Sequence, residues 1–365
     1  MKVLDYALPD LTLDYPINQE LPLEEFLFLD IETTGFAAST SNLYLIGAIY
    51  YRDNEFHLIQ WFANTLDDEV VILKAFLEFS ETFTHLVHFN GNQFDLPYLF
   101  EKCQQFQLGE SFASKVGIDL YRRVLPYKKF LKLSNCKQKT IESFLNIYRT
   151  DTYDGGELIT LYKEYLIAPS EYFLNKLLLH NAEDLLGLVQ ILPILSFTDL
   201  INHDNFVKKV QANSYKDVNG KIRQELLIYL TFPNKLPTPL SFGRKGCYFS
   251  ASDQEGYLKV PMLQKELKYF YENYKDYYYL PAEDAAIHKT LAASVSTTNR
   301  EQATAGTCYT RKEGTYLPQW TSLIKPFYKE SIKSPELYFE ITEELKRDRD
   351  FFTTYASHIM AQLVR

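Results

Sequence analysis

Cysteine is scarce in this chain of 365 residues, and its four cysteines lie far apart. Cys103, Cys136, Cys247 and Cys308 form no C-x-x-C pair, so they predict neither a zinc site nor a disulfide framework. No apolar run reaches the roughly 20 residues that cross a membrane. The N-terminus, M-K-V-L-D-Y-A-L-P-D, lacks the apolar region of a signal peptide. We therefore expect a cytoplasmic protein with reduced thiols and no membrane partner.

Basic residues are scarce at the start of the chain. Residues 1–120 carry 5 Lys or Arg against 19 Asp or Glu, and the whole chain has a net charge of −9. Residues 121–139 then carry 7 basic residues and no acid. This stretch predicts phosphate contacts, although a solvated helix face or loop would have the same composition. The candidate phosphate-binding residues are Arg122, Arg123, Lys128, Lys129 and Lys132, and the interleaved rings that could stack on bases are Tyr121, Tyr127 and Phe130.

The first acidic motif, D-I-E-T-T-G, follows the apolar run F-L-F-L. Residues two apart on a strand point to the same face, so Asp30 and Glu32 should lie side by side. Thr33, Thr34 and Gly35 would then turn the chain. A shared metal ion requires such a pair, but a solvated strand end could also carry it.

The second motif, F-N-G-N-Q-F-D-L-P-Y-L, reads as a strand, a turn and the start of a helix. Asn90 falls in the turn, and Asp95 falls in the first turn of a helix that starts near Phe94. The alternative for Asp95 is a helix-start acid that is favoured by the helix dipole.

The third motif is H-N-A-E-D-L-L-G-L. His180 and Asp184 are four residues apart, so they share one face of a helix. The alternative is a capping box, with Asn181 as the N-cap and Asp184 as the third helical residue. The three motifs together supply four carboxylates, Asp30, Glu32, Asp95 and Asp184. Two Mg²⁺ or Mn²⁺ ions require such oxygen ligands when they act on a phosphodiester.

These motifs resemble the DEDD (DnaQ-like) superfamily of 3′–5′ exonucleases, which has a ribonuclease-H-like fold, over about residues 23–195. The second motif is similar to that of the proofreading domains of family B DNA polymerases. The whole chain most resembles the bacterial YprB-type predicted exonucleases. The resemblance implies that Asp30 bridges two metal ions, that Glu32 and Asp184 complete the tighter site, and that Asp95 holds the second ion. It also implies that Asn90 and Phe94 shape the floor under the terminal nucleotide.

One position departs from that superfamily. Its members carry either Tyr four residues before the last Asp or His five residues before it, whereas this chain has His180 four residues before Asp184. A helical position rotates by about 100° per residue, so the sequence alone does not make the two arrangements equivalent. His180 could act as the base for the attacking water, or it could only hydrogen-bond a ligand or cap the helix end. Asp119 and Glu157 are further acids that helix capping explains at least as well as metal contact.

The apolar periodicity predicts an α/β region over residues 1–195, with a mixed sheet flanked by helices. The expected strands are 25–30, 43–51, 56–62, 84–89 and 116–119. The expected helices are 67–80, 94–106, 139–146, 156–167 and 171–194.

Residues 196–365 predict a second, mainly antiparallel β domain with a role in substrate binding or assembly. The expected strands are 205–213, 223–232, 246–250, 256–260, 265–271 and 303–309, and D-V-N-G at 217–220 predicts a hairpin turn. A short helix should follow Pro281, with Asp284 and His288 on one face, and a longer one should span 343–363. The aromatic segment 269–279 could fill a core, form a dimer contact and so a homo-oligomer, or stack on bases.

The expected function is metal-dependent hydrolysis of DNA or RNA from a 3′ end, with release of nucleoside 5′-monophosphates. One alternative keeps the metals but cuts internally, as other ribonuclease-H-like enzymes do. Another is a nucleic-acid-binding protein with a degenerate metal site, which the unusual His180 would favour. The four carboxylates argue against this last alternative.

Overall fold

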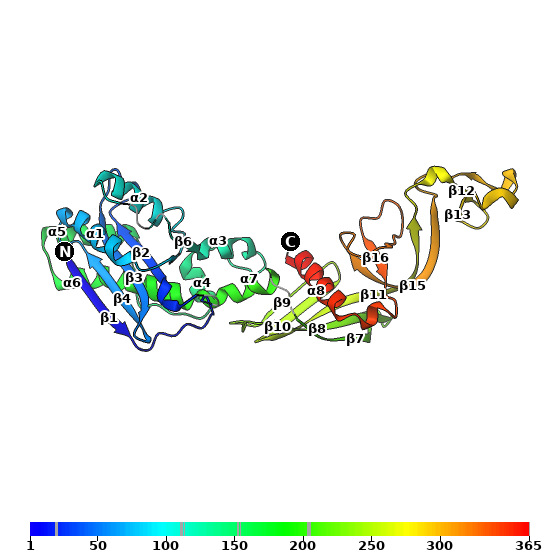
Figure 1. The fold of residues 1–365 in the computed structure, drawn as a ribbon. Helices are drawn as coiled ribbons and strands as arrows, with labels where there is room; N and C mark the ends of the chain where they lie inside the picture. The colour runs from blue at the N-terminus through cyan, green and yellow to red at the C-terminus, as the bar shows by residue number, and fades with distance from the viewer. Residues whose placement is uncertain are drawn as a thin grey trace. The chain divides into compact units, whose positions relative to one another are not determined.

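The computed structural model describes residues 1–18, 21–109, 112, 114–151, 153, 155–202 and 206–364. The chain divides into two compact units, Met1–Thr198 and Asp199–Arg365 (Figure 1).

A six-stranded mixed sheet forms the centre of the first unit, in the order β1-β4-β3-β2-β5-β6. Strands β1, β4, β3 and β2 pair antiparallel, whereas β2, β5 and β6 pair parallel. The strands are β1 (Lys2–Leu8), β2 (Phe26–Thr33), β3 (Leu43–Arg52), β4 (Glu55–Phe62), β5 (His85–His88) and β6 (Val116–Asp119). The expected mixed sheet is confirmed. Strand β1 was not expected, because it is an edge strand whose side chains are mostly exposed and give a weak apolar pattern.

Helices cover this sheet, with α1 packed on β3 and β4 and α6 packed on β2 and β3. The α-helices are α1 (Glu69–Ser80), α2 (Asp95–Gln105), α3 (Leu120–Val124), α4 (Gln138–Phe144), α5 (Gly155–Ile167), α6 (Glu171–Gln190) and α7 (Leu195–Asn202). The short 3-10 helices are η1 (Leu23–Glu25), η2 (Leu66–Asp68), η3 (Leu125–Tyr127) and η4 (Leu192–Ile194). The five expected helices are all present, with ends that differ by a few residues.

The span Glu171–Ile201 is long enough to cross a membrane and has a hydropathy of 1.6, but 67% of the scored window is buried inside the fold. Burial against the sheet accounts for its apolar character, because a helix that is covered by protein needs apolar residues on most of its faces. The four cysteines are buried, and none of them forms a disulfide bond within the described residues.

The second unit is built on antiparallel strands, as expected. One sheet has the order β16-β15-β11-β10-β9, and β8 pairs with β11 and β7; a smaller sheet has the order β13-β12-β14. The strands are β7 (Phe206–Lys216), β8 (Ile222–Thr231), β9 (Leu240–Arg244), β10 (Cys247–Ser252), β11 (Glu255–Phe270), β12 (Tyr277–Leu280), β13 (Ala285–His288), β14 (Glu301–Gln302), β15 (Tyr309–Gln319) and β16 (Leu337–Glu340). The helices are η5 (Tyr274–Asp276), η6 (Ala292–Ser294), η7 (Thr297–Asn299), η8 (Leu345–Arg347) and α8 (Arg349–Val364).

Several expectations for the second unit are confirmed. The D-V-N-G turn joins β7 to β8, with Gly220 at φ +76°. Helix α8 corresponds to the helix expected at 343–363 and buries an apolar face that includes Phe352, Tyr355 and Ile359. The strands expected at 256–260 and 265–271 are parts of the single long strand β11. The first residue of the strand expected at 205–213 lies outside the described residues.

The helix expected after Pro281 is wrong, because this segment forms a turn and then strand β13, which pairs with β12. Asp284 has φ 49°, which ends any right-handed helix there. Its carboxylate accepts hydrogen bonds from the hydroxyl groups of Tyr279 (2.6 Å) and Tyr309. Asp284 and His288 therefore do not share a helical face, since pairing with the aromatic strand outweighs the local helix signals.

Candidate active site

Strand β2 presents Asp30 and Glu32 on one face, as their spacing predicted. The Asp30 Oδ2 accepts a hydrogen bond of 2.8 Å from Asn181 Nδ2 on α6, and Asn181 Oδ1 accepts one of 2.9 Å from Gln60 Nε2 on β4. Gly47 on β3 lies opposite Asp30 in the sheet. A Cβ at Gly47 would lie 1.9 Å from Asn181 Oδ1, so glycine is what allows α6 to approach the sheet closely here.

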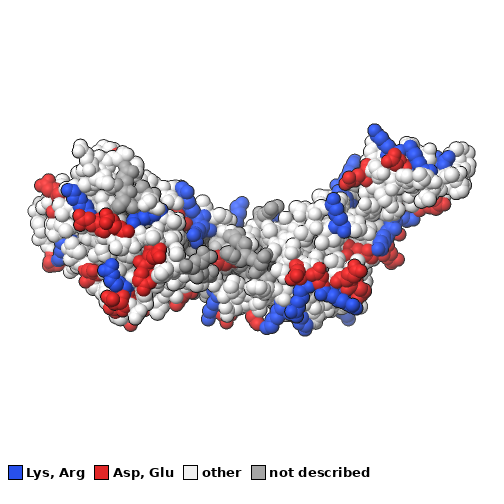
Figure 2. Space-filling view, viewed as in Figure 1, with Lys and Arg blue, Asp and Glu red and all other residues white. Residues whose placement is uncertain are grey.

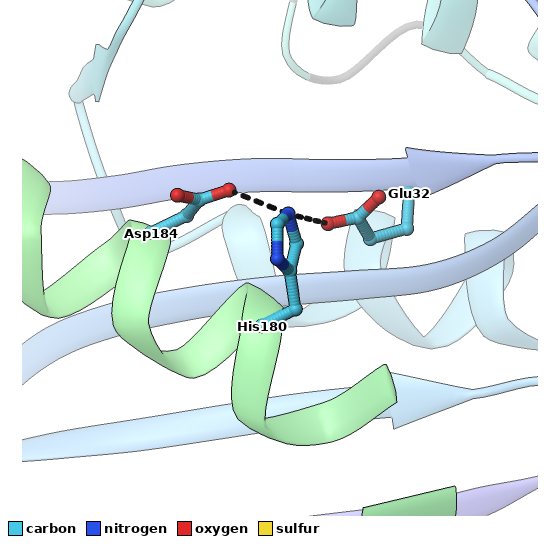
Figure 3. Close-up of side chains that lie close together, drawn as sticks. All are labelled: Glu32, His180 and Asp184. Atoms are coloured by element: carbon cyan, nitrogen blue, oxygen red, sulfur yellow. Dashed lines mark ion pairs between the residues drawn. The ribbon is translucent and has the colours of Figure 1, made fainter. Parts of the chain in front are cut away.

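Helix α6 brings His180 and Asp184 to the same place on successive turns (Figure 3). The His180 Nε2 lies 3.3 Å from Asp184 Oδ2 and 3.7 Å from Glu32 Oε1. Glu32, His180 and Asp184 each offer a ligand atom, and these atoms all lie within 4.8 Å of one another. The shared face is therefore confirmed. The capping alternative is wrong, because α6 begins at Glu171 and Asn181 lies in its interior.

Asp95 joins the site from the first residue of α2. Its Oδ1 accepts a hydrogen bond of 3.3 Å from the backbone N–H of Ile31, which lies between Asp30 and Glu32 on β2. Phe94 is the N-cap residue and lies edge-on to Phe36, with ring centroids 6.2 Å apart. Phe36 is 92% exposed, so this residue, which no sequence motif predicted, presents a ring to solvent beside Phe94.

The turn before α2 is organised by Asp119. This carboxylate accepts hydrogen bonds from the backbone N–H groups of Asn90 (3.0 Å), Asn92 (3.4 Å) and Arg122 (3.4 Å). Asp119 is thus the N-cap of α3, and this structural role explains it. Asn90 has φ 62°. Its side-chain Oδ1 is buried without a hydrogen-bond partner among the described residues.

Burial and the repulsion between neighbouring carboxylates set the pKa values of the acids in the site. Burial, followed by the charges of neighbouring acids, raises the pKa of Asp30 and Glu32 well above the usual range. Burial raises the pKa of Asp95 to about 7. Burial also disfavours the charged form of Asp184, but His180 and Arg149 outweigh it and lower the pKa of this carboxyl. Several carboxylates that are costly to ionise without a nearby positive charge form a set of oxygen ligands that suits hard divalent cations.

Arg149 and Asp151 also belong to the site, although no sequence motif predicted either residue. The Arg149 guanidinium contacts Glu142 on α4 and Asp184 on α6. The Asp151 Oδ2 lies 2.6 Å from His180 Nδ1. These residues lie in the segment that joins α4 to α5, and they contact residues of α6 that are 35 and 29 positions later in the chain. No local periodicity marks such residues, so only the tertiary structure reveals them.

Burial also decides the pKa of His180 together with its acidic neighbours. Burial lowers the pKa of the imidazole, but the hydrogen bonds and charges of Asp184 and Asp151 outweigh it and raise the pKa above its usual value.

Glu157 is exposed in the first turn of α5. It is not part of the group formed by Glu32, His180 and Asp184.

Only part of the basic stretch at residues 121–139 lies near the acidic site. Lys128 and Asn90 line a pocket of about 510 Å³ together with Tyr121 and Gln138. Gln138 also donates a hydrogen bond of 2.7 Å to the backbone oxygen of Asp184, so the pocket adjoins the acids. The other candidate phosphate-binding residues, Arg122, Arg123, Lys129 and Lys132, are exposed. The proposed stacking role of Phe130 is wrong, because its ring is buried.

Comparison with known proteins places residues 27–196 in the family described as the RNase_H superfamily. No curated protein sequence is significantly similar to the chain. Among solved structures, the family B DNA polymerase of the archaeon Pyrobaculum calidifontis is 16% identical, with a TM-score of 0.40, over 48% of this chain and 25% of the polymerase. Exonuclease I of E. coli in complex with a dT13 oligonucleotide is 12% identical, with a TM-score of 0.33, over 57% of this chain and 55% of the exonuclease.

The chain thus spans between a quarter and about half of the length of these two solved proteins. Their identities and TM-scores are too low to support any inference about activity. The match over residues 27–196 and the mixed sheet agree with each other. Residues 27–196 therefore match the RNase_H superfamily and have a ribonuclease-H-like fold, a mixed six-stranded sheet flanked by helices.

Proposed function

We propose that this protein is a divalent-metal-dependent 3′–5′ exonuclease that hydrolyses DNA or RNA to nucleoside 5′-monophosphates. The observation that supports this most directly is the meeting of three distant acidic segments. Asp30 and Glu32 come from β2, Asp95 comes from α2 and touches the backbone of β2, and Asp184 comes from α6. The raised pKa values of Asp30, Glu32 and Asp95 mean that ionising these three carboxyls is costly without a compensating cation.

The four carboxylates would hold two Mg²⁺ or Mn²⁺ ions, which would supply the positive charge that activates water and stabilises the leaving oxygen. Asn181 holds the Asp30 carboxylate through its 2.8 Å hydrogen bond, and Arg149 holds that of Asp184. Such outer contacts fix ligands in place before the ions arrive.

His180 is the residue that takes a proton from the attacking water. Its Nε2 faces Glu32 and Asp184 within the acidic group, and its Nδ1 is held by Asp151 on the other side. An imidazole that is fixed in this way can accept a proton at one defined atom. General-base groups of this kind contribute about 10²–10⁴-fold to the rate.

The substrate strand lies over Phe36 and Phe94 and continues into the pocket lined by Asn90, Tyr121 and Lys128. The exposed ring of Phe36 and its neighbour Phe94 offer a stacking surface for a base. The unpartnered Oδ1 of Asn90 offers a hydrogen-bond acceptor, and Lys128 offers a charge for phosphate.

The test is digestion of single-stranded DNA and RNA, each labelled at the 5′ end, with a free or a blocked 3′ terminus. We expect a ladder of progressively shorter labelled products and release of nucleoside 5′-monophosphates from the free terminus in Mg²⁺ or Mn²⁺, and no turnover in EDTA. Asp30→Asn should lose activity while its far-ultraviolet circular dichroism stays unchanged. His180→Gln should lose about 10²–10⁴-fold in rate.

The same assay distinguishes the two alternatives. Equal cleavage of the blocked substrate would identify an endonuclease. Binding of the strands without turnover in either metal would identify a nucleic-acid-binding protein with an inactive site.

A further inference from the structure

We propose that Asp151 is a positioning residue that fixes the tautomer and orientation of His180. The Asp151 carboxylate is buried, and its Oδ2 lies 2.6 Å from His180 Nδ1. In the arrangement that we propose, Nδ1–H donates this hydrogen bond and the Asp151 oxygen accepts it. The Nε2 atom is then the one left to face Glu32 and Asp184. This inference rests on the proposed function of the site.

Asp151 can do this because its own position is fixed. Its backbone N–H donates a hydrogen bond of 2.8 Å to Glu183 Oε2 on α6. Its Oδ1 accepts one of 3.2 Å from the backbone N–H of Tyr153, which leaves Oδ2 for His180. Lys139 Nζ lies 3.8 Å from Oδ2 and adds a positive charge beside it.

The segment 149–151 therefore contacts three residues of α6. Arg149 contacts Asp184. Thr150 and Asp151 both contact Glu183, and Asp151 also contacts His180.

The neighbours of His180 explain why a positioning residue is needed. A neutral imidazole has one donor nitrogen and one acceptor nitrogen. Glu32 and Asp184 both lie near Nε2, so on their own they would draw the single proton to that atom. An imidazole protonated at Nε2 could not accept a proton from water on this side. The 2.6 Å contact with Asp151 favours the opposite tautomer, in which Nε2 is the acceptor.

The experiment is ¹⁵N nuclear magnetic resonance of the metal-free protein labelled with ¹⁵N-histidine, at a pH high enough that the imidazole is neutral. His180→Gln assigns the signal. The wild type should show the Nδ1–H tautomer, Asp151→Asn should keep it through the amide oxygen, and Asp151→Ala should shift it toward Nε2–H. Glu164→Ala, an exposed acid on α5, is the matched control and should change nothing.

A kinetic readout accompanies the spectrum. Asp151→Ala should lower kcat by about 10–100-fold with little change in KM, the range seen for residues that orient a site's ligands. Asp151→Asn should recover most of this loss. An unchanged His180 tautomer in Asp151→Ala would overturn the inference. Because the spectrum needs no metal or substrate, an inactive wild type would instead count against the proposed function.

The second unit carries a separate pocket, and we infer that it binds single-stranded nucleic acid. The pocket has a volume of about 670 Å³ and lies where the end of β11 meets the segment 325–332. Four aromatic residues are among those that line it: Tyr269, Tyr271, Tyr274 and Phe327. Tyr274 is partly exposed, at 36%. Aromatic walls of this kind suit bases, because every base can stack on a ring.

The charges of the pocket indicate the same class of ligand. Lys325 and Lys329 line it, and neither has an ion pair in the part of the chain that the structure describes. Nearby Lys265 and Lys312, in contrast, pair with Glu330 and Glu340. The single acid of the lining is Glu272. Figure 2 shows both basic and acidic side chains on one face of this unit. Unpaired lysines beside aromatic rings match the alternation of phosphates and bases in a single strand.

The test uses fluorescence anisotropy of labelled single-stranded DNA and RNA with the full chain in EDTA, so that no cleavage occurs. Tyr271→Ala should weaken binding about 5–150-fold, the range for one lost base–ring stack. The double variant Lys325→Ala and Lys329→Ala should weaken binding and flatten its salt dependence. Tyr248→Ala, an exposed tyrosine on β10, is the control.

Wild-type affinity in both pocket variants would overturn this assignment. The double lysine variant guards against a packing defect, because Tyr271 also stacks on Tyr277. The DNA and RNA arms show which strand the pocket prefers. The result is independent of whether the first unit cleaves.

Discussion

Neutralising Asp95 should stabilise the metal-free protein above neutral pH. This carboxyl is buried, and burial raises its pKa to about 7 from an ordinary value of 3.8. Asp95→Asn removes the charge and keeps an oxygen that can accept the Ile31 N–H. The variant therefore isolates the cost of ionising the buried group from the loss of its hydrogen bond.

The sign and size of the effect follow from the two pKa values. Because the folded protein holds the Asp95 proton more tightly than the unfolded chain, protonated Asp95 stabilises the fold. This stabilisation is complete below the unfolded pKa of 3.8, and it is lost as the pH rises through the folded pKa of about 7. Each unit of pKa difference corresponds to about 1.4 kcal/mol. The unfolding free energy of the wild type should therefore fall by about 2–3 kcal/mol more between pH 5 and pH 8 than that of Asp95→Asn.

Urea unfolding in EDTA at pH 5 and pH 8 measures this difference. The exposed carboxylate of Asp10 supplies the control, since Asp10→Asn should follow the wild type at both pH values. Parallel pH profiles for the wild type and Asp95→Asn would refute the claim that Asp95 is ionised at a cost. Added Mn²⁺ should reverse the order at pH 8, because an ion that binds only the folded wild-type site stabilises it.

Four further predictions concern packing and binding. Gly47→Ala should destabilise the fold by about 1–3 kcal/mol or more, because its new Cβ would meet Asn181. Gly109→Ala is the control and should not destabilise the fold, because a Cβ there would have nothing within 4 Å. Equal urea midpoints for the two variants would contradict this prediction. Arg149→Ala should cost about 3–5 kcal/mol by leaving the buried Glu142 without its cation, and a loss below 1 kcal/mol would show that the pair is dispensable. Phe36→Ala should weaken single-strand binding by about 1–3 kcal/mol without changing stability, since the ring is 92% exposed; Ile167→Ala, at 85% exposure, is its control. Replacing Lys128, Lys129 and Lys132 with Ala should reduce the log–log salt slope of binding by about one or less per lost phosphate contact, and an unchanged slope would place the phosphate contacts elsewhere.

Local covalent geometry is what made the main features of the first unit predictable. The period of two along β2 placed Asp30 and Glu32 on one face, and the turn of α6 placed His180 beside Asp184. These relations hold wherever the strand or helix forms, whatever packs around it. The alternation of apolar runs with turn residues likewise indicated a mixed sheet with flanking helices.

Packing between distant segments decided the rest. Arg149 and Asp151 contact residues of α6 that are 35 and 29 positions later in the chain, and no spacing in the sequence encodes these contacts. The segment after Pro281 has helix-like composition, yet it pairs as strand β13 because an aromatic strand lies next to it. Phe130 belongs to a basic stretch, yet its ring is buried. The sequence alone determined which side chains each helix or strand presents together, because that depends on backbone repeat. Only the tertiary structure decided which elements meet, because that depends on the burial and hydrogen bonding of residues far apart in the chain.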